Sequence, residues 1–551
     1  MKKHLGYFLI FALIFAFVFM SLVINISTNL IDWRDYAYVT WIINQNINHL
    51  RALNFQNLFN TNAFFPYTNT VFLSDTLITQ SIIGLPFSFL TKNPVLIFNL
   101  VFFTTFLLNY LSSYLLFNKL LKNNLLSFIG SLAIVFSPFF YTQIGHFQMQ
   151  NYWPFLLILL LLFKTSSKRF SFDEVLIGFL IAIQFLASVY LAFFGIAAIF
   201  IFFLVQIYKG LNIKIASTKF GVIIFTFLIL DGIFIKGYMD ARKNFVITRG
   251  TNEYLVYSAK ISDYIFPRQN GFFYQNFIVR KWNTFNNHQF GEPASFPGFI
   301  LGALAILGLI KIERTKKYFS FHFSVDTSNL FFLCLMLIGL AFSLGYPYLP
   351  LAKYIPFFDT TRGTSRWSFL FYIGLIYFSI FYISKIKSKW FLAAAIILLI
   401  IDILPAKLTT YKDSYLSSND ETLKSICSVK KTVILEVPVT HFDAGDNIAV
   451  GLSYITKRQL ASLYNGCYLV NGYSGYDLPS IQQIKDRLIS SAQTGNADEF
   501  ISTVKESNAQ LLSINPEAVP PSTLPLLEKT LAKLEKQGKL KHIQNGVYRV
   551  D

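Results

Sequence analysis

Two aspartates at the start of the first polar segment are the residues best suited to acid–base chemistry. Asp32 and Asp35 stand in NLIDWRDYAYVTW, residues 29–41, directly after the first long apolar run. A half-buried carboxylate among aromatic side chains can take a proton from a hydroxyl group. A single acid in a loop more often just faces water, so the interpretation depends on the polar residues that accompany the pair.

Seven other polar residues occur in short motifs further along the chain. They are Asp75 in FLSDT, His146 and Gln148 in GHFQMQNYWP, Asp263 in AKISDYIFP, Glu292 before SFPG, and Arg362 and Arg366 in TTRGTSRW. Two arginines four residues apart suit a phosphate or diphosphate group. The alternative is that they anchor a helix at a membrane surface, with their charges reaching water. His146, taken alone, is more readily a packed interfacial residue than a ligand.

The composition is that of a membrane protein. Of the 551 residues, 54% are hydrophobic and 14% are charged, so the chain is more apolar and less charged than soluble proteins. About eleven apolar runs approach or exceed the length that crosses a bilayer. They lie near 5–27, 94–118, 124–142, 152–164, 174–189, 191–208, 219–236, 297–311, 327–345, 367–384 and 389–405. The first run is too long for a signal peptide, so we expect it to remain as the first span.

The charged loops predict which side of the membrane each segment faces. With the N-terminus in the cytoplasm, every short loop on the inside contains lysine or arginine, whereas the outer loop 143–151 contains neither. This agrees with the positive-inside rule and puts loops 28–93 and 237–296 outside, with everything after residue 405. The stretch 76–90 is too short for a span, so we expect it, like 36–55, to be an interfacial or re-entrant helix.

The chain after residue 405 has a different composition. It holds 16 basic and 15 acidic residues, so almost all of the net charge of +18 belongs to the membrane part and does not indicate nucleic-acid binding. The runs 432–439 and 510–515 predict strands and 522–537 predicts a helix. Together they indicate a small α/β domain outside the membrane. We therefore expect a membrane domain, 1–405, and an extracytoplasmic domain, 406–551.

Three features remain open at this level. The aromatic turn NGYSGY, residues 471–476, is either a packed loop or a sugar-binding loop. Cys427 and Cys467 share the tail, and no spacing rule decides whether they pair. Asp231 lies within a predicted span, which makes it a functional candidate, unless Lys236 is simply its ion-pair partner.

The motifs occur in an order that resembles a known family. DYAYVTW, FFPYTNTVFLSD, SPFFYTQIGHFQ with WP after it, SAKISDYIFP, a glutamate before FPG, TTRGTSRW, VILEVP and NGYSGY follow one another through nearly the whole chain. This set is similar to a bacterial group of integral membrane glycosyltransferases with the GT-C fold. The resemblance implies an α-helical polytopic protein of about eleven transmembrane helices, with a large acidic outer loop and a C-terminal extracytoplasmic α/β domain.

The resemblance also implies a transfer reaction at the outer face of the membrane. GT-C enzymes take a sugar from a polyprenyl-phosphate or polyprenyl-diphosphate carrier and join it to an acceptor hydroxyl with inversion. By position, Asp35 corresponds to the general base of the first outer loop, and Asp32 is its nearest substitute. From their charge and place, we infer that Arg362 or Arg366 stabilises the leaving phosphate.

Some GT-C enzymes also bind a divalent cation such as Mg²⁺ or Mn²⁺. Asp35, Asp75 and Asp263 are the candidate ligands for such an ion. Five residues are also candidates for binding the substrate and its phosphate: Asp75, Asp263, His146, Gln148 and Glu292.

Two other functional classes fit the sequence less closely. A transporter or flippase of lipid-linked sugars would place ionisable groups at mid-membrane and show internal repeats, but only Asp231 lies well inside a span. A non-catalytic membrane assembly protein would use the outer domain as its working part. On the favoured interpretation, the chain is a multi-pass protein of the plasma or inner membrane. Its partners are a polyprenyl-phosphate-linked sugar, membrane lipid, and a glycan, lipid or protein acceptor.

Overall fold

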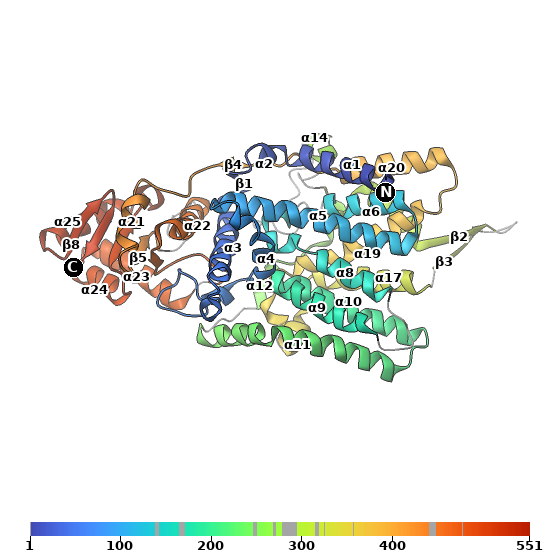
Figure 1. Ribbon diagram of the computed structural model, residues 1–551, viewed down its shortest axis with the longest axis horizontal. Coiled ribbons are helices and arrows are strands. Elements are labelled where there is room, and N and C mark those ends of the chain that lie inside the picture. Colours follow the sequence, from blue (N-terminus) through green and yellow to red (C-terminus); the bar gives the residue numbers. More distant parts are fainter. Residues whose placement is uncertain are drawn as a thin grey trace. The chain divides into compact units, whose positions relative to one another are not determined.

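The computed structural model describes residues 2–137, 143–164, 171–245, 251–267, 272–277, 295–314, 319–323, 326–355, 358–439, 448–476 and 478–551. Helices form most of this part of the chain (Figure 1). The chain divides into two compact units. Unit 1 holds Met1–Val23, Phe102–Ile233 and Thr248–Leu408, and unit 2 holds Ile24–Val101, Phe234–Ile247 and Thr409–Asp551.

Unit 1 is built mainly from apolar helices. Those that lie wholly inside it are α1 (Lys2–Val18), α6 (Asn124–Phe136), α8 (Trp153–Leu162), α9 (Phe172–Ala187), α10 (Val189–Tyr208), α12 (Thr251–Val256), α13 (Ile261–Ile265), α14 (Phe272–Phe277), α16 (Phe299–Leu309), α17 (Thr327–Ser343), α18 (Leu349–Tyr354), α19 (Ser368–Ile383) and α20 (Lys389–Ile403). The strands β2 (Ile310–Arg314) and β3 (Phe319–Phe323) form an antiparallel pair after α16. Three further helices contain residues of both units: α2 (Met20–Ile24), α5 (Pro94–Leu121) and α11 (Ile213–Asn244).

Helices α17 and α19 pack closely because a glycine lies at their contact. A Cβ atom on Gly339 of α17 would lie 2.3 Å from the backbone nitrogen of Phe371 in α19. Next to this contact, the rings of Phe332 and Tyr377 stack with centroids 4.0 Å apart. Small residues often let helix backbones approach in this way inside membranes.

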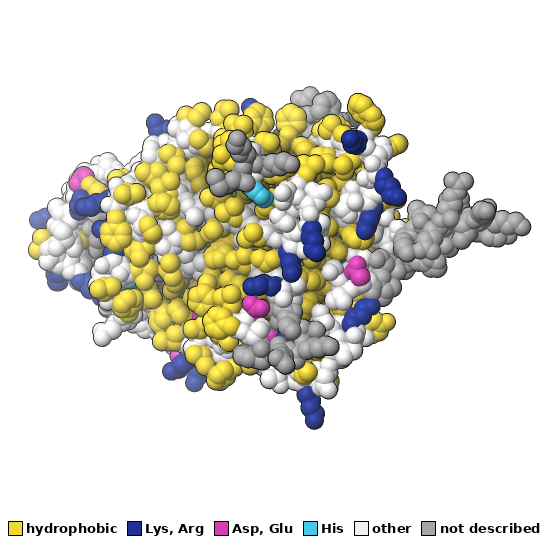
Figure 2. Space-filling view, turned by 45° about the vertical axis from the view of Figure 1, so that its right-hand side comes forward, with side chains coloured by type: hydrophobic (Ala, Val, Ile, Leu, Met, Phe, Trp, Pro, Cys, Tyr) yellow, Lys and Arg dark blue, Asp and Glu magenta, His cyan; other side chains and the backbone are white. Residues whose placement is uncertain are grey.

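Four helices in the described residues are long and apolar enough to cross a membrane: Pro94–Leu121, Val189–Tyr208, Ile213–Asn244 and Thr364–Ile383. The helices Thr327–Ser343 and Tyr346–Tyr354, bent by 99°, add a fifth if they count as one span. Shorter apolar helices cover His4–Val18, Asn124–Phe136, Phe147–Leu162 and Phe299–Leu309. Hydrophobic side chains are spread over the surface in Figure 2, and α11 exposes Phe225, Leu228, Ile229 and Ile233. These features are those of a multi-pass membrane protein, and the number of eleven spans stays a prediction.

The C-terminal residues of unit 2 form a five-stranded mixed sheet. Its strand order is β6 (Tyr468–Leu469), β5 (Val433–Val437), β7 (Leu511–Ile514), β9 (Val547–Val550) and β8 (Leu540–Gln544). β5 pairs in parallel with β6 and β7, and β9 pairs antiparallel with β7 and β8. The inner strands β5 and β7 are almost entirely buried, which explains their apolar runs. The strands predicted at 432–439 and 510–515 are confirmed.

Five helices accompany this sheet in the tail. They are α21 (Asp420–Cys427), α22 (Ile448–Asn465), α23 (Pro479–Thr494), α24 (Ala497–Glu506) and α25 (Leu524–Lys536). α25 buries Leu527, Leu531 and Leu534, the spacing expected when one face of a helix covers a core. The helix predicted at 522–537 is therefore confirmed.

Loop 28–93 folds together with the tail in unit 2. It contains β1 (Asn29–Leu30), α3 (Asp35–Arg51), α4 (Ile78–Gly84) and the 3₁₀ turns η1 (Phe55–Asn57), η2 (Thr70–Leu73) and η3 (Phe87–Phe89). β1 pairs with β4 (Tyr411–Lys412). Leu469 joins the two parts again, since its carbonyl accepts from Phe65 N–H and its own N–H donates to Asn62.

Two further statements about this region stay predictions. The stretches 36–55 and 76–90 do contain helices, α3 and α4, but a position at the membrane surface stays a prediction. The independence of residues 406–551 as a domain also stays a prediction. Residues 409–551 share one compact unit with loop 24–101.

Candidate functional site

Asp32 shapes the turn that leads into α3. Its Oδ1 accepts hydrogen bonds from the backbone N–H groups of Arg34 at 2.8 Å and of Tyr36 at 3.3 Å. Asparagine and aspartate commonly form turns in this way. Burial and the nearby charge of Asp35 raise the pKa of Asp32, although the two backbone bonds oppose this shift. Asp32 is thus engaged with its own backbone.

Asp35 is the first residue of α3, and its side chain is half-buried. Its Oδ1 accepts a hydrogen bond of 3.0 Å from the hydroxyl of Tyr473, which lies 438 residues further along the chain. Within the part of the chain that the structure describes, no hydrogen bond reaches Oδ2. One carboxylate oxygen of Asp35 is therefore held in place by a residue of the tail.

Tyr38 is close to both Asp35 and Asp75, and it interacts with both of their charges. Its ring meets that of Tyr473 edge to face, with centroids 5.3 Å apart and planes at 86°. Burial above all raises the pKa of Tyr38, the nearby Ser74 side chain opposes this, and the two carboxylates add to it. We call Asp35, Tyr38, Ser74, Asp75 and Tyr473 the acid cluster.

The turn 471–476 lies against the segment that carries Ser74. Gly475 N–H donates to the carbonyl of Leu73 at 3.0 Å, and a Cβ atom at Gly475 would come equally close to that oxygen. Tyr238, near the end of α11, donates to the Ser74 carbonyl at 2.9 Å. The turn is thus packed and reaches the acid cluster, while sugar binding by the turn stays a prediction.

The structure adds residues that the sequence did not single out. Tyr38 and Tyr473 both lie in motifs quoted above, but nothing in the sequence shows that they meet Asp35. The only available signal was that DYAYVTW and NGYSGY are both rich in tyrosine. Phenol hydroxyls near a carboxylate can both orient it and tune its charge.

Unit 1 carries the two predicted phosphate-binding arginines. Arg362 has Nη1 3.8 Å from Oε1 of Glu253, and its guanidinium lies 5.1 Å from the ring centre of Tyr257. Its side chain is 36% exposed. Arg366 is only 4% exposed and lies 4.7 Å from the ring centre of Tyr190. Arg366 is too buried to be a membrane anchor whose charge reaches water. Arg362 is the more exposed of the two and is therefore the more accessible to an anion.

The other predicted residues of unit 1 sit in short helices and turns. Asp263 is buried in α13, and its Oδ2 accepts from the Lys260 N–H at 2.8 Å, which caps this helix. His146 and Gln148 are half-buried at the turn η5 (Phe147–Gln150). Glu292 lies outside the described residues. Substrate contact stays a prediction for all four.

The described residues contain no group of three or more His, Cys, Asp or Glu side chains that could hold a metal ion. Asp35 and Asp75 belong to the acid cluster of unit 2, whereas Asp263 belongs to unit 1. Mg²⁺ demands six oxygen ligands, although waters and substrate phosphates often supply several of them. The binding of a divalent cation therefore stays a prediction, and the described residues do not contain a set of protein ligands for it.

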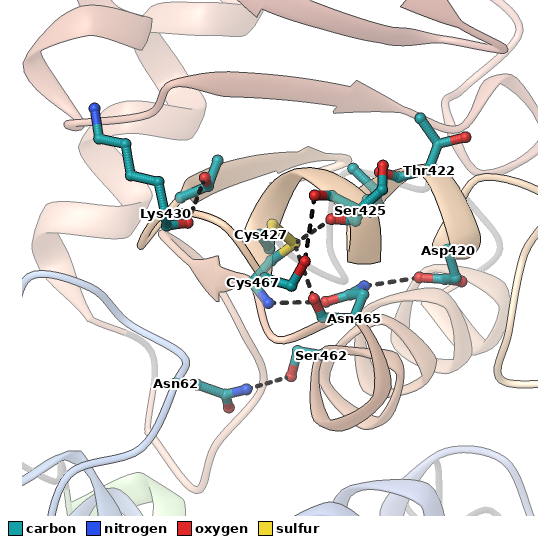
Figure 3. Close-up of a disulfide and its surroundings, with 12 residues drawn as sticks. Asn62, Asp420, Thr422, Ser425, Cys427, Lys430, Ser462, Asn465 and Cys467 are labelled. Atoms are coloured by element: carbon teal, nitrogen blue, oxygen red, sulfur yellow. Dashed lines mark hydrogen bonds between the residues drawn. A yellow bond between two sulfur atoms is a disulfide. The ribbon is translucent and has the colours of Figure 1, made fainter.

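A disulfide and a buried ion network hold the part of the tail that precedes the turn 471–476. Cys427 of α21 and Cys467 beside β6 are bonded, with Cα atoms 5.2 Å apart (Figure 3). Arg458 of α22 donates from Nε to Glu436 at 2.9 Å and from Nη1 and Nη2 to Asp420 at 2.9 and 3.0 Å. The structure thus answers the open question of the two tail cysteines, which pair.

Comparisons with known proteins give a family and two distant structural likenesses. The family model described as "Domain of unknown function (DUF6311)" matches residues 8–404. The comparison with curated proteins returned no match. The archaeal oligosaccharyltransferase AglB from Archaeoglobus fulgidus, in complex with an inhibitory peptide and a dolichol-phosphate, is 14% identical with a TM-score of 0.48, over 96% of this chain and 72% of that chain. The Archaeoglobus fulgidus oligosaccharyltransferase tethered to an acceptor peptide is 12% identical with a TM-score of 0.47, at the same coverage.

Proposed function

Because the chain belongs to the family described as "Domain of unknown function (DUF6311)", its activity must be inferred from its own residues, and we propose that it is a membrane glycosyltransferase. It transfers a sugar from a polyprenyl-phosphate or polyprenyl-diphosphate carrier to an acceptor hydroxyl on a glycan, lipid or protein. The reaction takes place at the outer face of the plasma or inner membrane and inverts the anomeric configuration.

The observation that carries this proposal is the arrangement of Asp35. Tyr473 holds Oδ1 at 3.0 Å, and the described residues make no hydrogen bond to Oδ2. A general base needs a fixed orientation and one oxygen within reach of the proton that it removes. The sequence resemblance independently implies a base at this position of the first outer loop.

In the proposed reaction, Oδ2 of Asp35 accepts the proton of the acceptor hydroxyl. At the same time, the oxygen of this acceptor hydroxyl attacks the anomeric carbon. The bond from that carbon to the phosphate oxygen of the carrier breaks, and the phosphate leaves with the electron pair. Attack on the face opposite the leaving group inverts the configuration. Arg362, which is partly exposed, is the candidate to neutralise the leaving phosphate. A divalent cation, when bound, would also neutralise charge there.

The tail disulfide supports an outer location. Disulfides form and persist in oxidising compartments and are rare in the cytosol, and the Cys427–Cys467 bond lies in unit 2. The acid cluster is in the same unit, so the compartment that oxidises the tail is also the compartment in which Asp35 works. The basic short loops of the sequence indicate the same orientation.

The test is transfer from a radiolabelled polyprenyl-phosphate sugar by the reconstituted protein. We expect Asp35→Asn to reduce the transfer rate by about 10²- to 10⁴-fold, because an amide cannot accept the proton. Asp486→Asn is the matched control, since Asp486 is 71% exposed on α23 and outside the acid cluster.

Asp32→Asn separates the two neighbouring acids. Asparagine keeps the side-chain oxygen that bonds the Arg34 and Tyr36 N–H groups, so this variant should transfer at close to the wild-type rate. Equal rates for wild type and Asp35→Asn would remove Asp35 as the base. Carrier binding without transfer by any variant would favour a non-catalytic assembly protein, and carrier movement across vesicles would favour a flippase.

A further inference from the structure

The main chain of Tyr473 is held at both of its polar groups by one buried side chain. Gln459 of α22 accepts from the Tyr473 N–H through Oε1 at 3.0 Å and donates from Nε2 to the Tyr473 carbonyl at 3.1 Å. Gln459 itself is fully buried, with 0% exposure. A buried amide pays a penalty if its bonds are broken, so this paired contact fixes the position of Tyr473.

The side chain of Tyr473 is held as firmly as its main chain. Its ring packs edge to face on Tyr38, and the Gly475 N–H bond to Leu73 anchors the turn two residues later. These contacts place the Tyr473 hydroxyl 3.0 Å from Oδ1 of Asp35. A residue from the tail thus sets the orientation of a carboxylate in the first outer loop.

We infer that Tyr473 is the positioning residue for Asp35, and that Gln459 positions Tyr473 in turn. This inference rests on the proposed function, in which Asp35 is the general base. Tyr473 fixes Oδ1 so that Oδ2 faces the incoming hydroxyl.

Other charged and titratable groups surround Asp35 and must be kept constant in a test. They are Asp32 and Arg34 in the preceding turn and Tyr38 on α3, and Tyr38 also interacts with the charge of Asp75. None of them donates a hydrogen bond to Asp35 among the described residues. Removal of the Tyr473 hydroxyl alone therefore leaves these groups in place.

The test is Tyr473→Phe, which keeps the ring and removes the hydroxyl. We expect the transfer rate at saturating carrier to fall by about 10- to 100-fold, which corresponds to a hydrogen bond to a charged group, with little change in KM for the carrier. Gln459→Met should give a milder change of the same kind.

Tyr464→Phe is the matched control. Tyr464 lies on the same helix as Gln459 and donates to a carboxylate, that of Glu421, but it lies outside the acid cluster. Its loss should leave the transfer rate and the KM for the carrier at wild-type values. An equal effect of both phenylalanine variants would overturn the inference, because it would show a general loss of tail stability.

A second readout does not need transfer activity. A carbodiimide with an amine labels carboxyl groups that the reagent can reach, and peptide mass spectrometry reports how fast Asp35 is labelled at one fixed pH. Asp35 should be labelled faster in Tyr473→Phe than in wild type and in Tyr464→Phe, because the tyrosine hydroxyl no longer covers Oδ1. An unchanged labelling rate would overturn the positioning role. If wild type transfers no sugar but Asp35 is labelled faster in Tyr473→Phe, the proposed function fails and the contact with Asp35 stands.

Discussion

At the scale of single residues, Asp32 and Asp35 show how neighbours with the same chemistry acquire different hydrogen-bond partners. Asp32 accepts two backbone N–H bonds, whereas Asp35 accepts one hydroxyl from a distant tyrosine. The sequence predicted Asp35 from its place in a motif. It could not predict Tyr473, because a contact across 438 residues depends on the packing of α22 and the tail.

Asp420 gives a prediction for acid stability. Burial raises its pKa, but hydrogen bonds and the charge of Arg458 outweigh burial, so the pKa lies below its ordinary value of 3.8. A carboxyl with a lowered pKa stabilises the fold above its ordinary value, and this contribution is lost as the pH falls through the lowered pKa. The Tm of wild type should therefore fall as the pH drops below the ordinary value of 3.8.

Asp420→Asn tests this contribution directly. At pH 7 the variant should lose roughly 1 to 3 kcal/mol, because a charged partner of Arg458 is removed. Its Tm should then change less than that of wild type as the pH falls, measured by tryptophan fluorescence in detergent. Asp486→Asn should follow wild type at every pH. Parallel curves for Asp420→Asn and wild type would show that Asp420 does not govern acid stability.

At the scale of elements, local pattern predicted β5, β7 and α25 because each buries a run or stripe of its own apolar residues. The same reasoning could not show that β1 pairs with β4, since two-residue strands have no pattern of their own. It also left open whether Cys427 and Cys467 form a disulfide. Their approach depends on where α21 and β6 pack, and cysteine spacing does not encode this.

The disulfide joins α21 to the strand that leads into the turn 471–476, across a separation of 40 residues. Replacing Cys427 and Cys467 with serine should lower the stability of unit 2 by roughly 2 to 4 kcal/mol, because the unfolded tail regains its freedom. The measurement is the Tm of the purified protein. Cys334→Ser, in which the free cysteine of α17 is changed, should leave the Tm within a degree or two of wild type.

At the scale of the whole molecule, composition and loop charges predicted a multi-pass membrane protein, and the apolar helices agree with this. The sidedness of the tail stays a prediction, and single cysteines can test it. In a Cys334→Ser background, Asp486→Cys should react with an impermeant maleimide in intact cells. Lys119→Cys, at the end of α5, should react only after the membrane is opened. Labelling of Lys119→Cys alone in intact cells would invert the proposed topology.

Helix α22 has a consequence for how relatives of this chain can diverge or be recombined. Within three turns it bonds the Trp33 carbonyl through Thr456, the Tyr473 backbone through Gln459 and Asn62 through Ser462. A tail taken from another relative would bring an α22 whose side chains match the loop of that relative and not the loop of this chain. We therefore expect chimaeras to preserve the fold of this unit when residues 24–101 and 409–551 come from one parent.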